Sequence, residues 1–159
     1  MEEFVTPKDI DKGARYDSLI RQARRLAARE SDMTANMANV AAMLRQAFGF
    51  FWIGFYRKAS EDELVLGPFQ GPVACPRIGF GKGVCGTAWR EGRTVVVPDV
   101  EKFPGHIACS SQSKSEIVVP MYDGGEFFAV LDIDSDELNT FDETDAKYLA
   151  ELVQSIRRR

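Results

Sequence analysis

Residues 115–134, SEIVVPMYDGGEFFAVLDID, contain two short runs of β-branched and aromatic residues on either side of a glycine pair. This pattern predicts an antiparallel hairpin with strands at Ser115–Met121 and Phe127–Asp134. Successive residues of a strand point to opposite faces of the sheet. The odd-numbered apolar residues therefore predict one buried face, made of Ile117, Val119, Met121, Phe127, Ala129, Leu131 and Ile133.

The turn between the two strands decides whether these seven residues can share that face. They share it only if the numbers of paired residues sum to an even value. A two-residue turn at Gly124-Gly125 would pair Tyr122 with Phe127, which is an odd sum. We therefore expect a turn with an odd number of residues, such as Asp123-Gly124-Gly125, or a bulge at a glycine.

The opposite face of this hairpin would carry three acidic residues, Glu116, Asp132 and Asp134. Like charges this close in a sheet destabilise it unless something neutralises them. Apolar residues on the same face would also need cover: Val118, Pro120, Phe128 and Val130. A covered acidic pocket is therefore favoured over a solvated face, because perturbed carboxyl groups often mark functional sites.

An earlier strand, at residues 50–56, would add aromatic side chains to the acidic face. Its alternation predicts Trp52 and Tyr56 on that face, with Gly54 leaving space between their rings. Phe51, Ile53 and Phe55 would then point into the core.

The rest of the chain predicts helices before and after a mainly antiparallel sheet, which is an α+β fold in one domain over residues 1–159. The expected elements are helices at 16–27 and 37–48 (with Asp32 as cap), a strand at 64–69, a short helix at 84–90, a strand at 94–97 and a last helix from Thr140. Thr140 and Glu143 have the spacing of a capping box. The stretch Asp99–Lys114 shows no periodicity and is long for a connection, so it predicts a binding or lid loop.

Composition excludes several classes of function. The 159 residues carry a net charge of -4, which argues against nucleic-acid binding. No run approaches the length of a membrane span, and the acidic start Met1-Glu2-Glu3-Phe4 is unlike a secretory signal. We therefore expect a cytoplasmic location, where cysteines are more often catalytic, metal-binding or buried thiols than permanent bridges.

The three cysteines, Cys75, Cys85 and Cys109, are too far apart in sequence for a C-x-x-C motif. A zinc site with His106 as fourth ligand is one alternative, although zinc ligands usually come as close pairs. A second alternative is that all three cysteines are buried and pack as small hydrophobic residues. That second alternative suits Cys85, which is in the predicted short helix, and does not suit Cys109 in the long loop.

Five blocks of the sequence resemble the free methionine (R)-sulfoxide reductases, which are small enzymes built on a GAF domain. The blocks are WIGFY (52–56), GKGVCGTA (81–88), FPGHIAC (103–109), SEIVVP (115–120) and LDIDS (131–135). The similarity covers nearly the whole chain. It implies a GAF-like sheet with helices packed on one face and cysteine-bearing loops covering the other.

The resemblance also implies roles for individual residues. Cys109 matches the attacking cysteine, Cys75 the partner that closes a disulfide with it, and Cys85 an auxiliary cysteine; whether Cys85 or Cys109 attacks first is left open. The substrate pocket matches Trp52, Tyr56, Glu116, Asp132 and Asp134. Among these, Glu116 is our first choice for the acid that protonates the sulfoxide oxygen, and Asp132 and Asp134 stay open as alternatives.

The implied reaction reduces free methionine (R)-sulfoxide through a cysteine sulfenic acid and a disulfide. Thioredoxin is the implied reductant, and the chemistry requires no metal, flavin or nucleotide cofactor. The alternative is a GAF domain that senses a small ligand without turnover, since a fold does not determine function. The oligomeric state, including a homodimer, is open at this stage.

Overall fold

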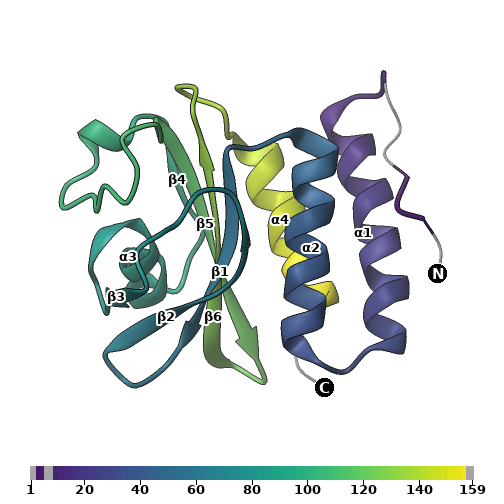
Figure 1. Cartoon of the computed structure of the whole chain (residues 1–159), viewed down its shortest axis with the longest axis horizontal. Coiled ribbons are helices and arrows are strands. Elements are labelled where there is room, and N and C mark those ends of the chain that lie inside the picture. The colour runs from purple at the N-terminus through teal and green to yellow at the C-terminus, as the bar shows by residue number, and fades with distance from the viewer. Residues whose placement is uncertain (1–2, 6–8, 157–159) are drawn as a thin grey trace.

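A six-stranded antiparallel sheet separates three long helices from a smaller layer of loops and one short helix in the computed structural model, which describes residues 3–5 and 9–156 (Figure 1). The helices are α1 (Lys12–Arg29), α2 (Met33–Phe48), α3 (Gly83–Glu91) and α4 (Glu143–Ser155), with a 3₁₀ turn η1 (Val100–Lys102). The strands are β1 (Trp52–Lys58), β2 (Glu63–Gln70), β3 (Arg77–Gly79), β4 (Val95–Val97), β5 (Ser115–Asp123) and β6 (Glu126–Ser135). Their spatial order is β3-β2-β1-β6-β5-β4, which confirms the expected α+β class.

The helical layer buries the apolar face that the sequence predicted for β5 and β6. Ile117, Val119, Leu131 and Ile133 are fully or almost fully buried against α1, α2 and α4. Asp32 caps α2 as expected, since its side chain accepts the backbone N–H of Ala35. None of the helices in the described part of the chain has the length and hydropathy that a membrane crossing requires.

The β5–β6 hairpin solves the register problem by a different route from the one predicted. Pairs run with even sums as far as Met121 and Ala129, and the register then shifts, so that Tyr122 pairs with Phe127. The turn is Gly124-Gly125 with φ values of 57° and 82°, which suits a two-residue turn that only glycine-like residues make easily. The irregularity therefore lies inside the strands, and the expectation of an odd turn or a bulge at a glycine was wrong.

This bulge also places Phe127 and Phe128 on the faces opposite to those predicted. Phe128 packs in the core on the helical side, whereas Phe127 lies on the opposite face and stacks on Trp89 with ring centroids 5.1 Å apart. The predicted faces of Phe127 and Phe128 were therefore both wrong. One extra residue on one strand of a pair shifts every side chain beyond it to the other face.

The structure differs from the sequence-based expectations at three further places. Phe51 lies outside β1 and packs on the face away from the helices, while its neighbour Phe50 enters the helical core. Strand β3 was not predicted, because three residues that pair only with β2 carry no detectable alternation. The last helix is capped by Asp142, not Thr140: Asp142 and Asp145 form the reciprocal capping box.

Asp145 also holds the helices to one another. It is 1% exposed, and its carboxylate accepts the Tyr16 hydroxyl at 2.6 Å and the backbone N–H of Asp142 at 2.9 Å. The ammonium group of Lys12 forms an ion pair with it at 2.6 Å. One buried carboxylate thus joins the start of α1 to the start of α4.

We expect Asp145→Ala to lower the free energy of unfolding by about 2–4 kcal/mol, because it leaves a buried hydroxyl and a backbone N–H without an acceptor. Glu151→Ala is the matched control, since it removes an exposed ion pair with Arg24 (3.1 Å) between the same two helices. That change should cost less than about 1 kcal/mol. Urea denaturation of the three proteins measures both effects, and equal losses would contradict the role given to Asp145.

Candidate active site

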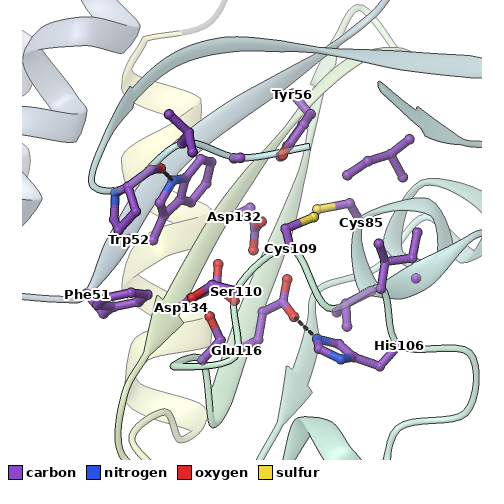
Figure 2. A pocket seen from close by; sticks show the side chains of 18 of the residues that line it. Phe51, Trp52, Tyr56, Cys85, His106, Cys109, Ser110, Glu116, Asp132 and Asp134 are labelled. Atoms are coloured by element: carbon purple, nitrogen blue, oxygen red, sulfur yellow. Dashed lines mark hydrogen bonds and ion pairs between the residues drawn. The ribbon is translucent and has the colours of Figure 1, made fainter. Parts of the chain in front are cut away.

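A pocket lies between the sheet face that points away from the long helices and the loops on either side of α3 (Figure 2). Strands β1, β5 and β6 form its floor. The loop before β3 carries Cys75, and the loop from η1 to β5 carries Cys109. The pocket is lined by seven of the eight site residues predicted from the sequence: Trp52, Tyr56, Cys85, Cys109, Glu116, Asp132 and Asp134. The eighth, Cys75, is not among the lining residues.

The aromatic wall comes from β1. The rings of Trp52 and Tyr56 lie 6.0 Å apart and nearly parallel. Gly54 separates them, and a Cβ at this position would lie 2.3 Å from an atom of the Trp52 ring. A side chain of any size here would therefore displace the tryptophan, which explains the glycine between two aromatic residues.

These aromatic residues also hold the loop that carries Cys75. The Trp52 indole N–H donates to the carbonyl oxygen of Pro72 at 3.0 Å. The Tyr56 hydroxyl donates to the carbonyl oxygen of Cys75 at 2.9 Å. Two side chains from one strand thus set the height of the loop above the pocket floor.

The acidic floor forms as the alternation predicted. Glu116 pairs with Asp134 across β5 and β6, and Asp132 pairs with Val118. Glu116 and Asp132 are only 5% and 6% exposed. In the part of the chain that the structure describes, no lysine or arginine forms an ion pair with any of the three acids.

Burial raises the pKa of each of these acids. The pKa of Glu116 rises to about 8, mainly by desolvation and secondly by the charge of Asp134. The pKa values of Asp132 and Asp134 are also raised well above the ordinary range, again mainly by burial. Close acidic groups cannot all ionise cheaply, so the cluster retains protons near neutral pH.

The cysteines take two different environments. Cys75 and Cys109 form a disulfide with Cα atoms 5.7 Å apart, and Cys109 is exposed. Cys85 is a free thiol, 3% exposed, at the start of α3 beneath them. Burial raises its pKa, and the charge of Asp132 adds to this effect. The alternative Cys₃His zinc set is therefore not assembled here, because two of its ligands are bonded to each other.

The loop that shows no periodicity in the sequence covers the pocket, as expected for residues 99–114. His106 Nε2 lies 3.7 Å from Glu116 Oε2, and burial lowers the pKa of this imidazole. Ile107 packs against Gly83. Ser110 and Ser113 also line the pocket and were not predicted, because an aperiodic loop gives no signal for which way its side chains point.

Comparisons with known proteins place this site in a family. A GAF-domain family profile matches residues 27–158. Free methionine-R-sulfoxide reductase of Neisseria meningitidis, solved in complex with its substrate, superposes with a TM-score of 0.94 over 98% of this chain and 93% of the other, at 54% identity. The chain belongs to the GAF-domain family of free methionine-R-sulfoxide reductases.

Two curated members of this reductase family extend the match. The Escherichia coli enzyme of that name is 41% identical over 150 residues, which cover 94% of this chain and 90% of its own. The Saccharomyces cerevisiae enzyme is 39% identical over 158 residues, with 94% and 88% covered. Both matches therefore span nearly the whole chain.

In this GAF-domain protein, burial of Glu116 should make stability fall as pH rises. The unfolded chain releases this proton near pH 4.3, whereas the folded chain keeps it to about pH 8, so between these values the unfolded state binds fewer protons. Glu116→Gln removes the titration. The wild type should therefore lose stability relative to Glu116→Gln as pH rises. The difference between their free energies of unfolding should shift by about 2–5 kcal/mol in favour of the variant between pH 4 and pH 8.

Urea denaturation of the disulfide form over this pH range measures the effect. Glu61→Gln is the control, because its side chain is 94% exposed and should leave the profile unchanged. Parallel profiles for wild type and Glu116→Gln would contradict a raised pKa at Glu116.

Proposed function

We propose that this protein reduces free L-methionine (R)-sulfoxide to methionine. The observation that carries the proposal is the position of an exposed disulfide cysteine, Cys109, at the wall of a pocket floored by buried, proton-retaining carboxyl groups. Reduction of a sulfoxide by a thiol needs these two features together. The family comparison supports the same activity, because matched relatives carry the name of this enzyme.

In the proposed reaction the Cys109 thiolate attacks the sulfoxide sulfur. The S–O bond breaks, the oxygen takes a proton, and methionine leaves while Cys109 becomes a sulfenic acid. The Cys75 thiol then attacks the sulfenic sulfur, which releases water and closes the disulfide. Each turnover therefore consumes two electrons, which a dithiol returns by exchange.

Cys109 suits the attacking role better than Cys85. The thiolate is the nucleophilic form, and burial raises the pKa of the Cys85 thiol. Cys109 is exposed on a loop and reaches both the pocket and Cys75. We therefore assign Cys109 as the nucleophile, Cys75 as the resolving cysteine and Cys85 as an auxiliary thiol beneath them.

Glu116 is the proposed proton donor. A sulfoxide oxygen leaves readily only when it is protonated, so an acid must lie against it. With a pKa of about 8, Glu116 still carries a proton at neutral pH. After transfer its carboxylate lies near His106, which can return a proton from solvent.

The remaining carboxyl groups and the aromatic wall account for a free amino acid as substrate. Asp132 and Asp134 would hold its α-ammonium group, which a methionine inside a peptide lacks. Trp52 and Tyr56 would contact the S-methyl group and the side-chain carbons. The ammonium supplies the positive charge that the floor otherwise takes up as protons.

A thioredoxin-type dithiol in the cytoplasm is the proposed reductant. The disulfide lies among exposed apolar side chains: Val73, two residues before Cys75, is 89% exposed, and Ile107, two residues before Cys109, is 38% exposed. A protein dithiol could therefore reach it without unfolding the loops. A non-catalytic ligand sensor, the alternative, would not need a disulfide at the wall of its pocket.

Replacement of single cysteines tests the assignment. Cys109→Ser should abolish turnover, because serine is not ionised near neutral pH. Cys75→Ser should release one methionine per protein and then stop when thioredoxin is the reductant. Cys85→Ser should retain turnover, and methionine release by single-turnover and steady-state assays measures all three. An active Cys109→Ser enzyme would refute the scheme.

Substrate comparison tests the ammonium contact. N-acetylation of methionine sulfoxide removes the positive charge and leaves the sulfoxide unchanged, so kcat/KM should fall at least about a hundredfold. Methionine sulfoxide methyl ester is the matched control, since it keeps the ammonium and should lose less. Equal kcat/KM values for the free and N-acetylated compounds would remove the role given to Asp132 and Asp134.

A further inference from the structure

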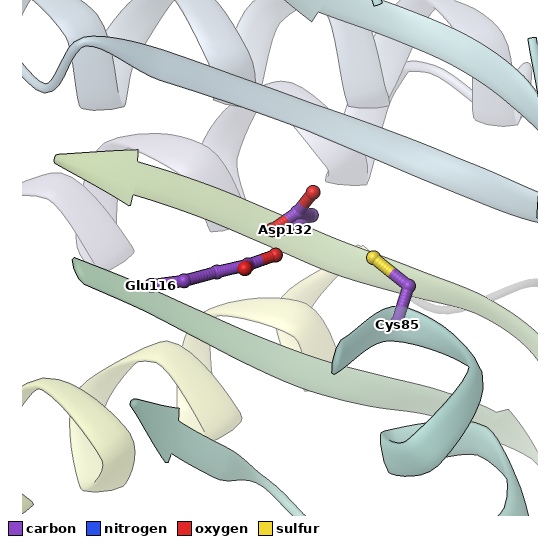
Figure 3. A group of neighbouring side chains, drawn as sticks. All are labelled: Cys85, Glu116 and Asp132. Atoms are coloured by element: carbon purple, nitrogen blue, oxygen red, sulfur yellow. The ribbon is translucent and has the colours of Figure 1, made fainter. Parts of the chain in front are cut away.

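The side chains of Cys85, Glu116 and Asp132 lie close together at the pocket floor (Figure 3). They come from α3, β5 and β6, and one donor atom from each lies within 4.8 Å of the other two. His106 Nε2 lies 3.7 Å from a carboxyl oxygen of Glu116. One thiol and two carboxyl groups thus surround a small volume at the pocket floor, and the imidazole contacts this cluster through Glu116 alone.

An unpartnered atom lies in this cluster. Asp132 Oδ1 is inaccessible to solvent and has no hydrogen-bond partner among the described residues. A buried carboxyl oxygen without a donor is costly, so a native structure usually supplies it with a proton, a cation or a donor group. Glu116 can satisfy this oxygen only while it keeps its proton, and a bound cation can satisfy it once that proton leaves.

We propose that Cys85, Glu116 and Asp132 form a binding site for a divalent cation of the zinc class, and that the bound ion excludes the sulfoxide substrate. The exclusion rests on the proposed function, because it uses the same carboxyl groups that would hold the substrate. The ion acts here as a reversible inhibitor, since the reaction itself uses no metal.

The donor set selects the ion. A thiolate together with carboxylate oxygens suits Zn²⁺ and its soft relative Cd²⁺, whereas Mg²⁺ and Ca²⁺ take oxygen ligands almost exclusively. Tetrahedral zinc, with bonds of about 2.0–2.3 Å, places its ligand atoms roughly 3.3–3.8 Å apart. The donor atoms of Cys85, Glu116 and Asp132 lie within 4.8 Å of one another, so side-chain rotations that bring them closer together would complete the site. Binding transfers the thiol and carboxyl protons to solvent.

The disulfide form provides a direct test. It contains one free thiol, Cys85, because Cys75 and Cys109 are bonded to each other. Titration with Cd²⁺ should therefore produce one equivalent of the ultraviolet thiolate-to-cadmium charge-transfer band, and competition with Zn²⁺ should abolish it. A ten-millimolar excess of Mg²⁺ is the specificity control and should leave the band unchanged. No band in the wild type overturns the proposal.

Variants identify the ligands. Cys85→Ser should abolish the band, and Asp132→Asn should weaken Cd²⁺ affinity on the order of a hundredfold, the upper end of what loss of even an outer partner costs. Asp134→Asn is the matched control, because it removes an acid from the same strand and face that lies outside the cluster; its affinity should change by less than about tenfold. Thermal unfolding checks that each variant is folded. Equal losses in Asp132→Asn and Asp134→Asn would mean a non-specific acidic patch and would overturn the named ligand set.

Displacement separates this inference from the proposed function. Free methionine sulfoxide added to the disulfide form cannot be reduced, so it should raise the apparent Kd for Cd²⁺ in proportion to its concentration. A band that the sulfoxide does not displace, in a protein that turns over normally, overturns the exclusion. A displaceable or stable band in a protein without turnover would refute the enzyme assignment and leave the metal site standing.

Discussion

Strand β6 places Asp132 and Asp134 two residues apart on the face to which β5 contributes Glu116, and loops exclude solvent from this face. Glu116 and Asp132 are buried and Asp134 is half-buried, and the three acids repel one another when ionised. The folded protein therefore holds them partly protonated or pairs them with a cation from outside. The raised pKa values follow from this one arrangement, and so do the roles proposed for it as proton donor and as partner of an ammonium group.

Such a site opposes stability, and the architecture places it away from the elements that provide stability. The face of the same strands that points to α1, α2 and α4 forms the larger apolar core, and the buried Asp145 joins two of these helices. The pocket side contributes a smaller core around α3. Because neighbouring residues of a strand point to opposite faces, a single pair of strands supports both the core and the strained acidic floor.

Strand alternation was the part of the fold and site that the sequence could predict. It placed Glu116, Asp132 and Asp134 together because a period of two is independent of what covers the sheet. It failed at Phe127 and Phe128, since a bulge shifts the period and its position depends on packing against Trp89 and the helices. The orientation of Ser113 toward the pocket could not be predicted for a related reason, because an aperiodic loop takes its conformation from tertiary contacts alone.

The buried cluster also explains how one pocket can have several competing occupants. A proton on Glu116, the ammonium group of an amino acid and a divalent cation all supply the positive charge that the floor lacks. In the proposed site each would exclude the others, because the donor atoms of Cys85, Glu116 and Asp132 lie within 4.8 Å of one another. Cys85 decides which cation binds: a thiol is a poor partner for an ammonium group and a good ligand for a zinc-class ion. A serine at this position would keep the shape of the site and lose that preference, so the buried thiol has a chemical consequence beyond packing.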